Sequence, residues 1–162
     1  MTHNHTFCFF QDNLGYIDKT KTAVWGWSYG GYLSLMTLAK DKNEVFQCGA
    51  SVAPVADWTL YDTYYTERYM GTKDGNQQGY ARSSALQYLS NLKSKKYYLL
   101  HGTYDDNVHY QNSMLISAAL EGMYSTMWKL QKFTLTKTGF YFLVSEFLVF
   151  PHFQWHESRQ MN

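Results

Sequence analysis

Apolar and polar residues alternate in blocks between residues 22 and 121. Three short apolar runs predict strands, and the first is continuous enough for a strand covered on both faces. These runs cover residues 22–26, 48–53 and 96–101. Three longer segments predict helices, which cover residues 29–40, 58–69 and 111–121. Because strands and helices alternate, the pattern predicts an α/β fold with a mostly parallel sheet and crossover helices.

A glycine-rich turn joins the first predicted strand to the first predicted helix. Its sequence is Gly-Trp-Ser-Tyr-Gly-Gly, with Ser28 at the centre. A serine between a strand and a helix in such a turn is the nucleophile elbow of an α/β-hydrolase, and it attacks acyl carbonyls. The alternative is a glycine-rich turn in another α/β domain, in which Ser28 only caps the helix.

Two acids follow the third predicted strand, at the end where ligands collect in parallel sheets. Asp105 fits the second place in the order serine, acid, histidine that α/β-hydrolases follow along the chain. The alternative is that Asp105 and Asp106 form a turn or cap the helix that begins near Gln111.

Three aromatic residues lie three and four positions apart in the segment predicted as the second helix. They are Trp58, Tyr61 and Tyr65. On a helix these rings share one face, which can form a flat wall for a small apolar ring. The alternative is that the rings pack into the core.

Composition narrows the range of partners. The formal net charge is +1, so the chain shows no sign of a nucleic-acid partner. The strongly apolar residues 140–150 include Glu146 and are too few for a membrane span, which needs about 20. His3 and His5 lack further ligands nearby, so we predict neither a metal site nor a cofactor.

Four segments taken together are specific, although each alone is not. They cover residues 25–32, 52–55, 65–71 and 100–109. In this order they resemble the prolyl oligopeptidase family of serine peptidases, in particular its dipeptidyl peptidase IV and fibroblast activation protein subfamily. The resemblance runs from about residue 10 to residue 121. It implies an α/β-hydrolase fold and a serine-type exopeptidase that releases N-terminal dipeptides after proline or alanine.

The resemblance also implies roles for single residues. Ser28 matches the nucleophile, Asp105 the triad acid, and the backbone N–H of Tyr29 an oxyanion-hole donor. Asn107 matches a residue that holds a substrate carbonyl. The pocket for the proline-like ring matches Val55, Trp58, Tyr61, Tyr65 and Val108.

Other features of the family are absent from this sequence. The triad histidine of the family lies in an Asp-x-x-His-Gly motif, and no such motif follows Asp105. The propeller and the glutamates that bind the substrate amine are also missing. Cys48 matches one half of a family disulfide, but no cysteine follows it.

We therefore expect residues 1–121 to form a partial hydrolase domain and residues 122–162 a divergent tail. The chain is then a fragment without its catalytic histidine, inactive alone, whose partners are a peptide substrate and a second copy in a homodimer. The resemblance implies a membrane-anchored or secreted protein. Two alternatives remain, a non-catalytic dimerisation module and a non-functional gene product.

Overall fold

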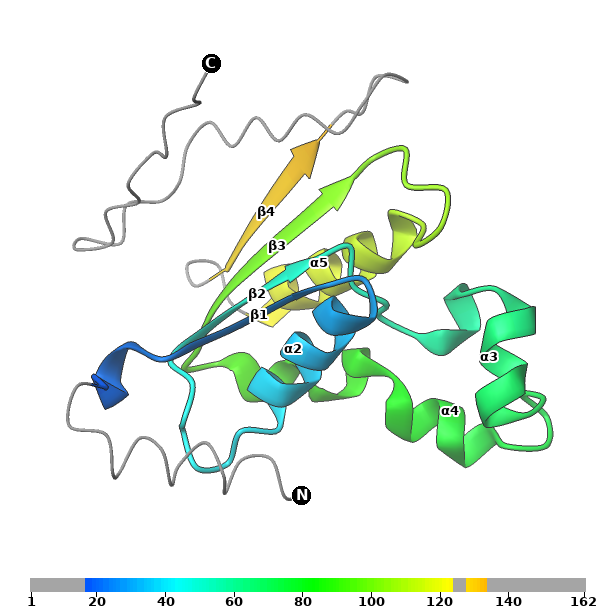
Figure 1. Cartoon of the computed structure of the whole chain (residues 1–162), viewed down its shortest axis with the longest axis horizontal. Coiled ribbons are helices and arrows are strands. Elements are labelled where there is room, and N and C mark those ends of the chain that lie inside the picture. The colour runs from blue at the N-terminus through cyan, green and yellow to red at the C-terminus, as the bar shows by residue number, and fades with distance from the viewer. Residues whose placement is uncertain (1–16, 124–127, 134–162) are drawn as a thin grey trace, which may run out of the picture.

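A computed structural model describes residues 17–123 and 128–133. Its centre is a sheet of four parallel strands in the order β1-β2-β3-β4 (Figure 1). In register, Trp27 pairs with Val52 and Val52 with Leu100, so the carboxyl ends of the first three strands lie at one edge. The strands are β1 (Ala23–Trp27), β2 (Cys48–Val52), β3 (Lys96–Gly102) and β4 (Trp128–Phe133).

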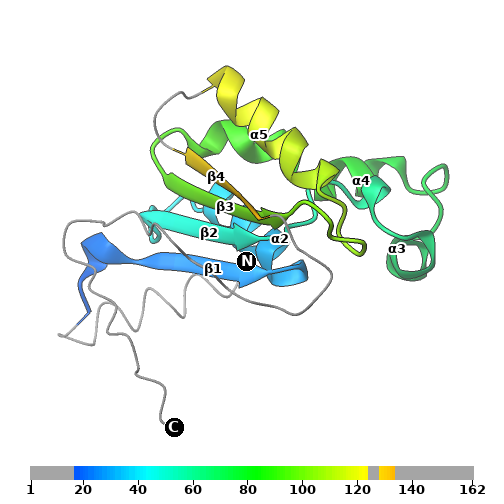
Figure 2. The same cartoon turned by 90° about the horizontal axis from the view of Figure 1, so that it is seen from above.

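Helices connect the strands and cover the sheet. Helix α2 packs on β1 and β2, helix α5 packs on β3, and the 3-10 helix η3 contacts both helices. Figures 1 and 2 show α3 and α4 beyond the carboxyl ends of the strands. The helices are α2 (Tyr29–Ala39), α3 (Thr63–Met70), α4 (Gln77–Ser83) and α5 (Gln111–Met123). The 3-10 helices are η1 (Lys19–Lys21), η2 (Trp58–Leu60) and η3 (Ala85–Leu92). None of the described helices is long and apolar enough to cross a membrane.

The core lies between the sheet and these helices. Its largest fully buried apolar side chains are Leu35, Leu38, Leu89, Leu99, Ile116 and Leu120. The side chains of β1 alternate between this core and solvent, because successive residues of a strand point to opposite faces. The prediction that this strand is covered on both faces is wrong, since Trp25 and Trp27 on its second face are 73% and 43% exposed. In the described part of the chain, β1 forms one edge of the sheet.

The predicted alternation of strands and helices is confirmed, and three predicted strands and two predicted helices agree closely with the structure. The predicted continuous helix over residues 58–69 is wrong. The chain forms η2 and then starts α3 anew at Thr63. Two aspartates cause the break, because Asp57 accepts a hydrogen bond from Thr59 N and Asp62 from Tyr65 N, both at 2.8 Å. Such local bonds favour helix starts over helix interiors.

Strand β4 was not predicted. It lies beyond the expected boundary at residue 121 and pairs in parallel with β3, from Tyr97–Trp128 to Gly102–Phe133. The rest of the expected tail, including the apolar residues 140–150, lies outside the described residues.

Candidate active site

Ser28 lies at a sharp turn between β1 and α2. Its backbone has φ 57° and ψ −119°, a conformation that is strained for a residue with a side chain. The turn is anchored by Ser28 N–H, which donates to the carbonyl of Val52 at 2.8 Å. Ser28 precedes the first helical residue, but its side chain makes no capping hydrogen bond. This excludes the interpretation of Ser28 as a simple helix cap and leaves its hydroxyl available.

Two of the neighbouring glycines are required by close approach of the backbone. A Cβ at Gly26 would lie 2.2 Å from the carbonyl oxygen of Gly30, and one at Gly31 would lie 2.8 Å from that of Val52. A Cβ at Gly30 would meet nothing within 4 Å. The glycines therefore allow the first turn of α2 to lie against the ends of β1 and β2.

Two buried serines form hydrogen bonds that anchor the first turn of α2. Ser51 Oγ donates to the carbonyl of Gly31 at 2.8 Å. Ser34 Oγ lies 2.9 Å from Ser51 Oγ and 3.0 Å from the carbonyl oxygen of Ala50. These bonds connect α2 to β2 and fix the start of the helix. Because Tyr29 is the first residue of that helix, its N–H has no acceptor within the helix and is available to an oxyanion.

Asp105 lies in the loop that follows β3. Its Oδ1 accepts hydrogen bonds from the N–H groups of Asn107 and Val108, each at 3.0 Å. Asp105 therefore stabilises a turn through Oδ1, as the alternative interpretation expected. The second oxygen, Oδ2, lies 3.6 Å from Nε2 of His101.

Ser28 and Asp105 lie at the same edge of the sheet, because each follows the carboxyl end of a strand. The strands β1 and β3 are separated only by β2, so their axes are about 10 Å apart. A histidine ring that bridges a serine and an acid requires both groups on one edge of the sheet, and Ser28 and Asp105 meet that requirement.

The rings predicted to form a wall do meet, although they do not share a helix. Trp58 stacks on Tyr65 at 6.1 Å between ring centroids, and Tyr61 meets the edges of both at 6.0 and 5.4 Å. Tyr29 extends this cluster to the serine turn, 5.6 Å from Trp58. Tyr69 extends it at the other end, 5.0 Å from Tyr65.

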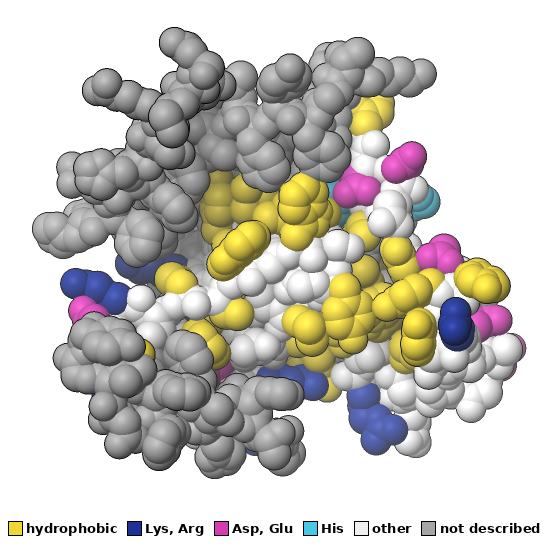
Figure 3. All heavy atoms as spheres, in the orientation of Figure 1, with side chains coloured by type: hydrophobic (Ala, Val, Ile, Leu, Met, Phe, Trp, Pro, Cys, Tyr) yellow, Lys and Arg dark blue, Asp and Glu magenta, His cyan; other side chains and the backbone are white. Residues whose placement is uncertain are grey.

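Hydrophobic side chains gather between α2 and α3 in the space-filling view (Figure 3). The aromatic cluster divides into a buried base and an exposed rim. Trp58 is 6% exposed, whereas Tyr29 and Tyr65 are 47% and 37% exposed. The alternative of core packing therefore holds for Trp58 and in part for Tyr61, which is half-buried and packs against the core, but not for Tyr65. The sequence reasoning missed the ring of Tyr29 and missed Tyr69, although Tyr69 follows Tyr65 at helical spacing.

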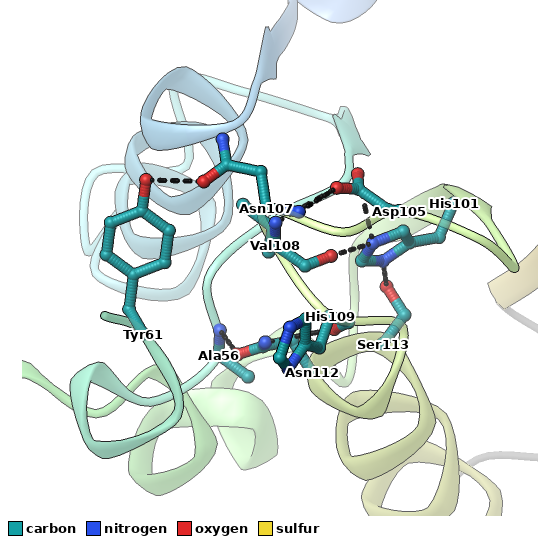
Figure 4. A network of polar contacts seen from close by, with 9 residues as sticks. All are labelled: Ala56, Tyr61, His101, Asp105, Asn107, Val108, His109, Asn112 and Ser113. Carbon is teal, nitrogen blue, oxygen red and sulfur yellow. Dashed lines mark hydrogen bonds and ion pairs between the residues drawn. The ribbon is translucent and has the colours of Figure 1, made fainter. Parts of the chain in front are cut away.

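One hydrogen bond joins the aromatic cluster to the acid loop. The hydroxyl of Tyr61 donates to Oδ1 of Asn107 at 2.9 Å (Figure 4). This bond orients the amide of Asn107, so that its Nδ2 group remains free to donate. Val55 and Val108 are buried in the same core, each 2% exposed. Asn112 joins their segments, since its Oδ1 accepts from Ala56 N and its Nδ2 donates to His109 O.

Neither histidine in the described part of the chain has the geometry of a triad base. His109 is exposed. His101 is 1% exposed, and its two ring nitrogens contact Ser113 Oγ and Val108 O. A triad base needs one nitrogen on the acid and the other on the serine. His152 and His156 lie outside the described residues. Within the described ranges, no cluster of three or more histidine, cysteine or acidic side chains could hold a metal ion.

Comparison with known proteins decides the family. The sequence profile of the prolyl oligopeptidase family matches residues 8–138, most of the chain. The chain belongs to the prolyl oligopeptidase family. The match includes the serine turn, the aromatic cluster, the acid loop and strand β4, and it continues beyond residue 121.

Similar proteins narrow the relationship within this family. The chain is 49% identical over 112 residues to venom dipeptidyl peptidase 4 of Apis mellifera, covering 68% of this chain and 14% of the relative. It is 42% identical over 127 residues to a probable dipeptidyl-aminopeptidase B of Arthroderma gypseum, covering 78% and 14%. The crystal structure of dipeptidyl peptidase 4 from Porphyromonas gingivalis matches with a TM-score of 0.73 and 40% identity, covering 81% and 18%.

These matches confirm the predicted resemblance and the partial α/β-hydrolase fold. The chain spans only 14% to 15% of the length of the curated relatives named dipeptidyl peptidase 4.

Proposed function

We propose that this chain carries the nucleophile and the acid of a dipeptidyl peptidase. Its aromatic cluster forms the wall of the pocket that receives the proline of the substrate. Ser28 Oγ attacks the carbonyl carbon of the proline or alanine at the second position of the substrate. The C–N bond after that residue breaks, and the rest of the peptide leaves as an amine. The N-terminal dipeptide remains as an acyl-enzyme until water hydrolyses the ester. The N–H of Tyr29 donates to the oxyanion. The observation that carries the proposal is the strained turn at Ser28, whose hydroxyl is not used in capping and lies at the sheet edge that also bears Asp105.

The aromatic cluster supports the substrate class. The exposed rims of Tyr29 and Tyr65 stand on the buried ring of Trp58, next to the serine turn. Flat rings held in this way offer contact area to a proline ring without new ordering of the protein. Asn107, oriented by Tyr61, supplies an N–H donor for a substrate carbonyl.

We further propose that residues 17–123 and 128–133, the part of the chain that the structure describes, do not contain the general base for Ser28. The proton of Ser28 must pass to a histidine for rapid attack, and neither His101 nor His109 has the required position. Residual reactivity then comes from the oxyanion donor and the substrate wall. In this proposal the hydrolase region is only part of a longer catalytic unit.

A dipeptidyl phosphonate ester with proline next to phosphorus tests this function. We expect slow, covalent labelling of the full chain at Ser28, detected by peptide mass spectrometry, and none in Ser28→Ala. The matched probe with glycine in place of proline should label at least about tenfold more slowly, because it leaves the aromatic wall unfilled. Equal rates for the two probes would contradict the substrate class, and no labelling of folded protein would contradict the nucleophile.

A second candidate is a non-catalytic dimerisation module. The observation that favours it is the exposed side chain of Trp25 on β1, an edge strand in the described part of the chain. Sedimentation at several concentrations should then show a discrete dimer that Trp25→Ser weakens. A monomer at every concentration would remove this candidate.

A further inference from the structure

His101 is a buried histidine next to the acid loop that the proposed chemistry does not use. It is the second-last residue of β3 and is 1% exposed. Its Nδ1 lies 2.6 Å from Ser113 Oγ on α5, and its Nε2 lies 2.7 Å from the carbonyl oxygen of Val108 (Figure 4). One ring therefore connects the end of β3, the loop and the first turn of α5.

The partners of the ring fix which nitrogen carries the proton in its neutral form. The carbonyl of Val108 can only accept, so Nε2 must carry a proton and donate it. Nδ1 then accepts the hydroxyl proton of Ser113 in the neutral ring. Burial lowers the pKa of His101, although the bond to Val108 and the charge of Asp105 oppose that effect. Tyr110, whose ring meets His101 edge-on at 5.5 Å, is the other titratable group beside it.

His101 forms a hydrogen bond with Val108, and Val108 forms one with Asp105. Val108 accepts from His101 through its carbonyl and donates to Asp105 Oδ1 through its N–H at 3.0 Å. Asp105 Oδ2 faces the same ring nitrogen at 3.6 Å, which is too long for a hydrogen bond. The position of the carboxylate thus depends on an Nε2 donor beneath the loop.

We propose that His101 is a positioning residue for Asp105, which it holds at the serine edge by donating from Nε2 to Val108. The inference rests on the proposed role of Asp105 as the triad acid. His101 itself touches no reacting atom. Its chemical requirement is a neutral donor at the position of Nε2, supported by a hydroxyl at Ser113.

Two amide substitutions in the full chain separate this requirement from simple packing. In His101→Gln the side-chain NH2 reaches the position of Nε2 and keeps the donor to Val108. In His101→Asn the amide reaches only the position of Nδ1 and loses that donor. The readout is the NMR shift of the Asn107 and Val108 amide protons, which donate to Asp105. Asp105→Asn supplies the shifts expected when the carboxylate is lost.

We expect His101→Asn to move both amide shifts more than halfway toward those of Asp105→Asn, and His101→Gln to move them less than a quarter of the way. Long-range ¹H–¹⁵N spectra of the unsubstituted chain should show the Nε2–H tautomer. Equal shifts in the two His101 variants, or an Nδ1–H tautomer, would overturn the inference. If both variants lose near-UV dichroism, they have lost their packed structure and their shifts are not used. The tautomer of the unsubstituted chain then tests the inference by itself.

These readouts do not depend on whether Ser28 reacts. Labelling by the proline phosphonate tests the function separately, because residual labelling without a general base does not depend on the carboxylate of Asp105. An unreactive chain with the expected tautomer and shifts would remove the proposed function and leave the role of His101 in the loop standing.

Discussion

At the scale of single residues, backbone geometry explains the serine turn. Ser28 has a positive φ, and the carbonyl of Gly30 lies where a Cβ of residue 26 would stand. The surrounding bonds, from Ser28 N–H to Val52 and from Ser51 to Gly31, hold this conformation in place. Strain of this kind persists only where the rest of the fold compensates for it.

A matched pair of substitutions tests this account. Gly26→Ala should lower the free energy of unfolding by about 1–3 kcal/mol, because the new methyl group collides with the backbone of Gly30. Gly30→Ala should be nearly neutral, since its Cβ would meet nothing within 4 Å. Urea denaturation of both variants measures the difference. A Gly26→Ala variant as stable as Gly30→Ala would show that the turn differs from the one described.

The pKa of His101 predicts a dependence of stability on pH. The folded state lowers this pKa from 6.5, so the unfolded chain binds a proton that the folded chain resists. The stabilisation from the neutral ring is therefore complete above about pH 6.5 and is lost as the pH falls through the folded pKa. Urea denaturation between pH 7.5 and 5 should show this loss, and His101→Gln should reduce it. An unchanged slope in that variant would assign the dependence to other groups.

At the scale of elements, short polar bonds decide where helices begin. Asp62 Oδ1 caps α3 through Tyr65 N, and Asn76 Oδ1 caps α4 through Gly79 N at 3.1 Å. The start of α3 sets the position of Tyr65 over Trp58. The arrangement of the aromatic rings thus depends on the helix cap at Asp62. It does not arise from the spacing of the rings along one continuous helix.

Loss of this cap should disturb the wall. Asp62→Ala should cost about 1 kcal/mol and loosen α3, so that the near-UV dichroism of the stacked rings decreases. Asp74→Ala is the control, because Asp74 is exposed and caps no helix. Equal spectra for the two variants would show that α3 does not depend on Asp62.

The sequence allowed some of these elements to be predicted and not others. The glycines around Ser28 and the apolar runs of β1 to β3 are local signals, so the turn and the alternation of strands and helices along the chain followed from them. Asp57 and Asp62 could have signalled two helix starts, but the spacing of the rings favoured one helix. The partnership of His101 with Ser113 and Val108 had no local signal, because only the packing of α5 on β3 brings these residues together.

At the scale of the whole molecule, a buried ion pair joins the end of α2 to the start of β3. It lies away from the sheet edge that bears Ser28. Lys95 Nζ lies 3.2 Å from Asp41 Oδ2 and donates to the carbonyl of Phe46 at 2.7 Å. Asp41 follows α2 and Lys95 precedes β3, and both side chains are at most 5% exposed. The second oxygen of Asp41 has no partner in the described part of the chain.

Removing one member of this pair should be costly. Lys95→Met leaves the carboxylate of Asp41 buried without its cation, so the free energy of unfolding should fall by about 3–5 kcal/mol. Lys93→Met, at an exposed position nearby, should change it by less than about 0.5 kcal/mol. The double variant Lys95→Met with Asp41→Asn should recover part of the loss. Thermal melting measures all three, and a Lys95→Met variant as stable as Lys93→Met would contradict the burial of the pair.

The central claim is that Ser28 is a nucleophile raised at the sheet edge that also bears Asp105. The most direct measurement is the residue modified by a small fluorophosphonate, read by peptide mass spectrometry on the folded full chain and on the heat-unfolded chain. We predict a single adduct on Ser28 that needs the folded chain, absent from Ser28→Ala and reduced in Gly26→Ala. An adduct spread over several serines, or equal labelling of folded and unfolded chains, would contradict the claim.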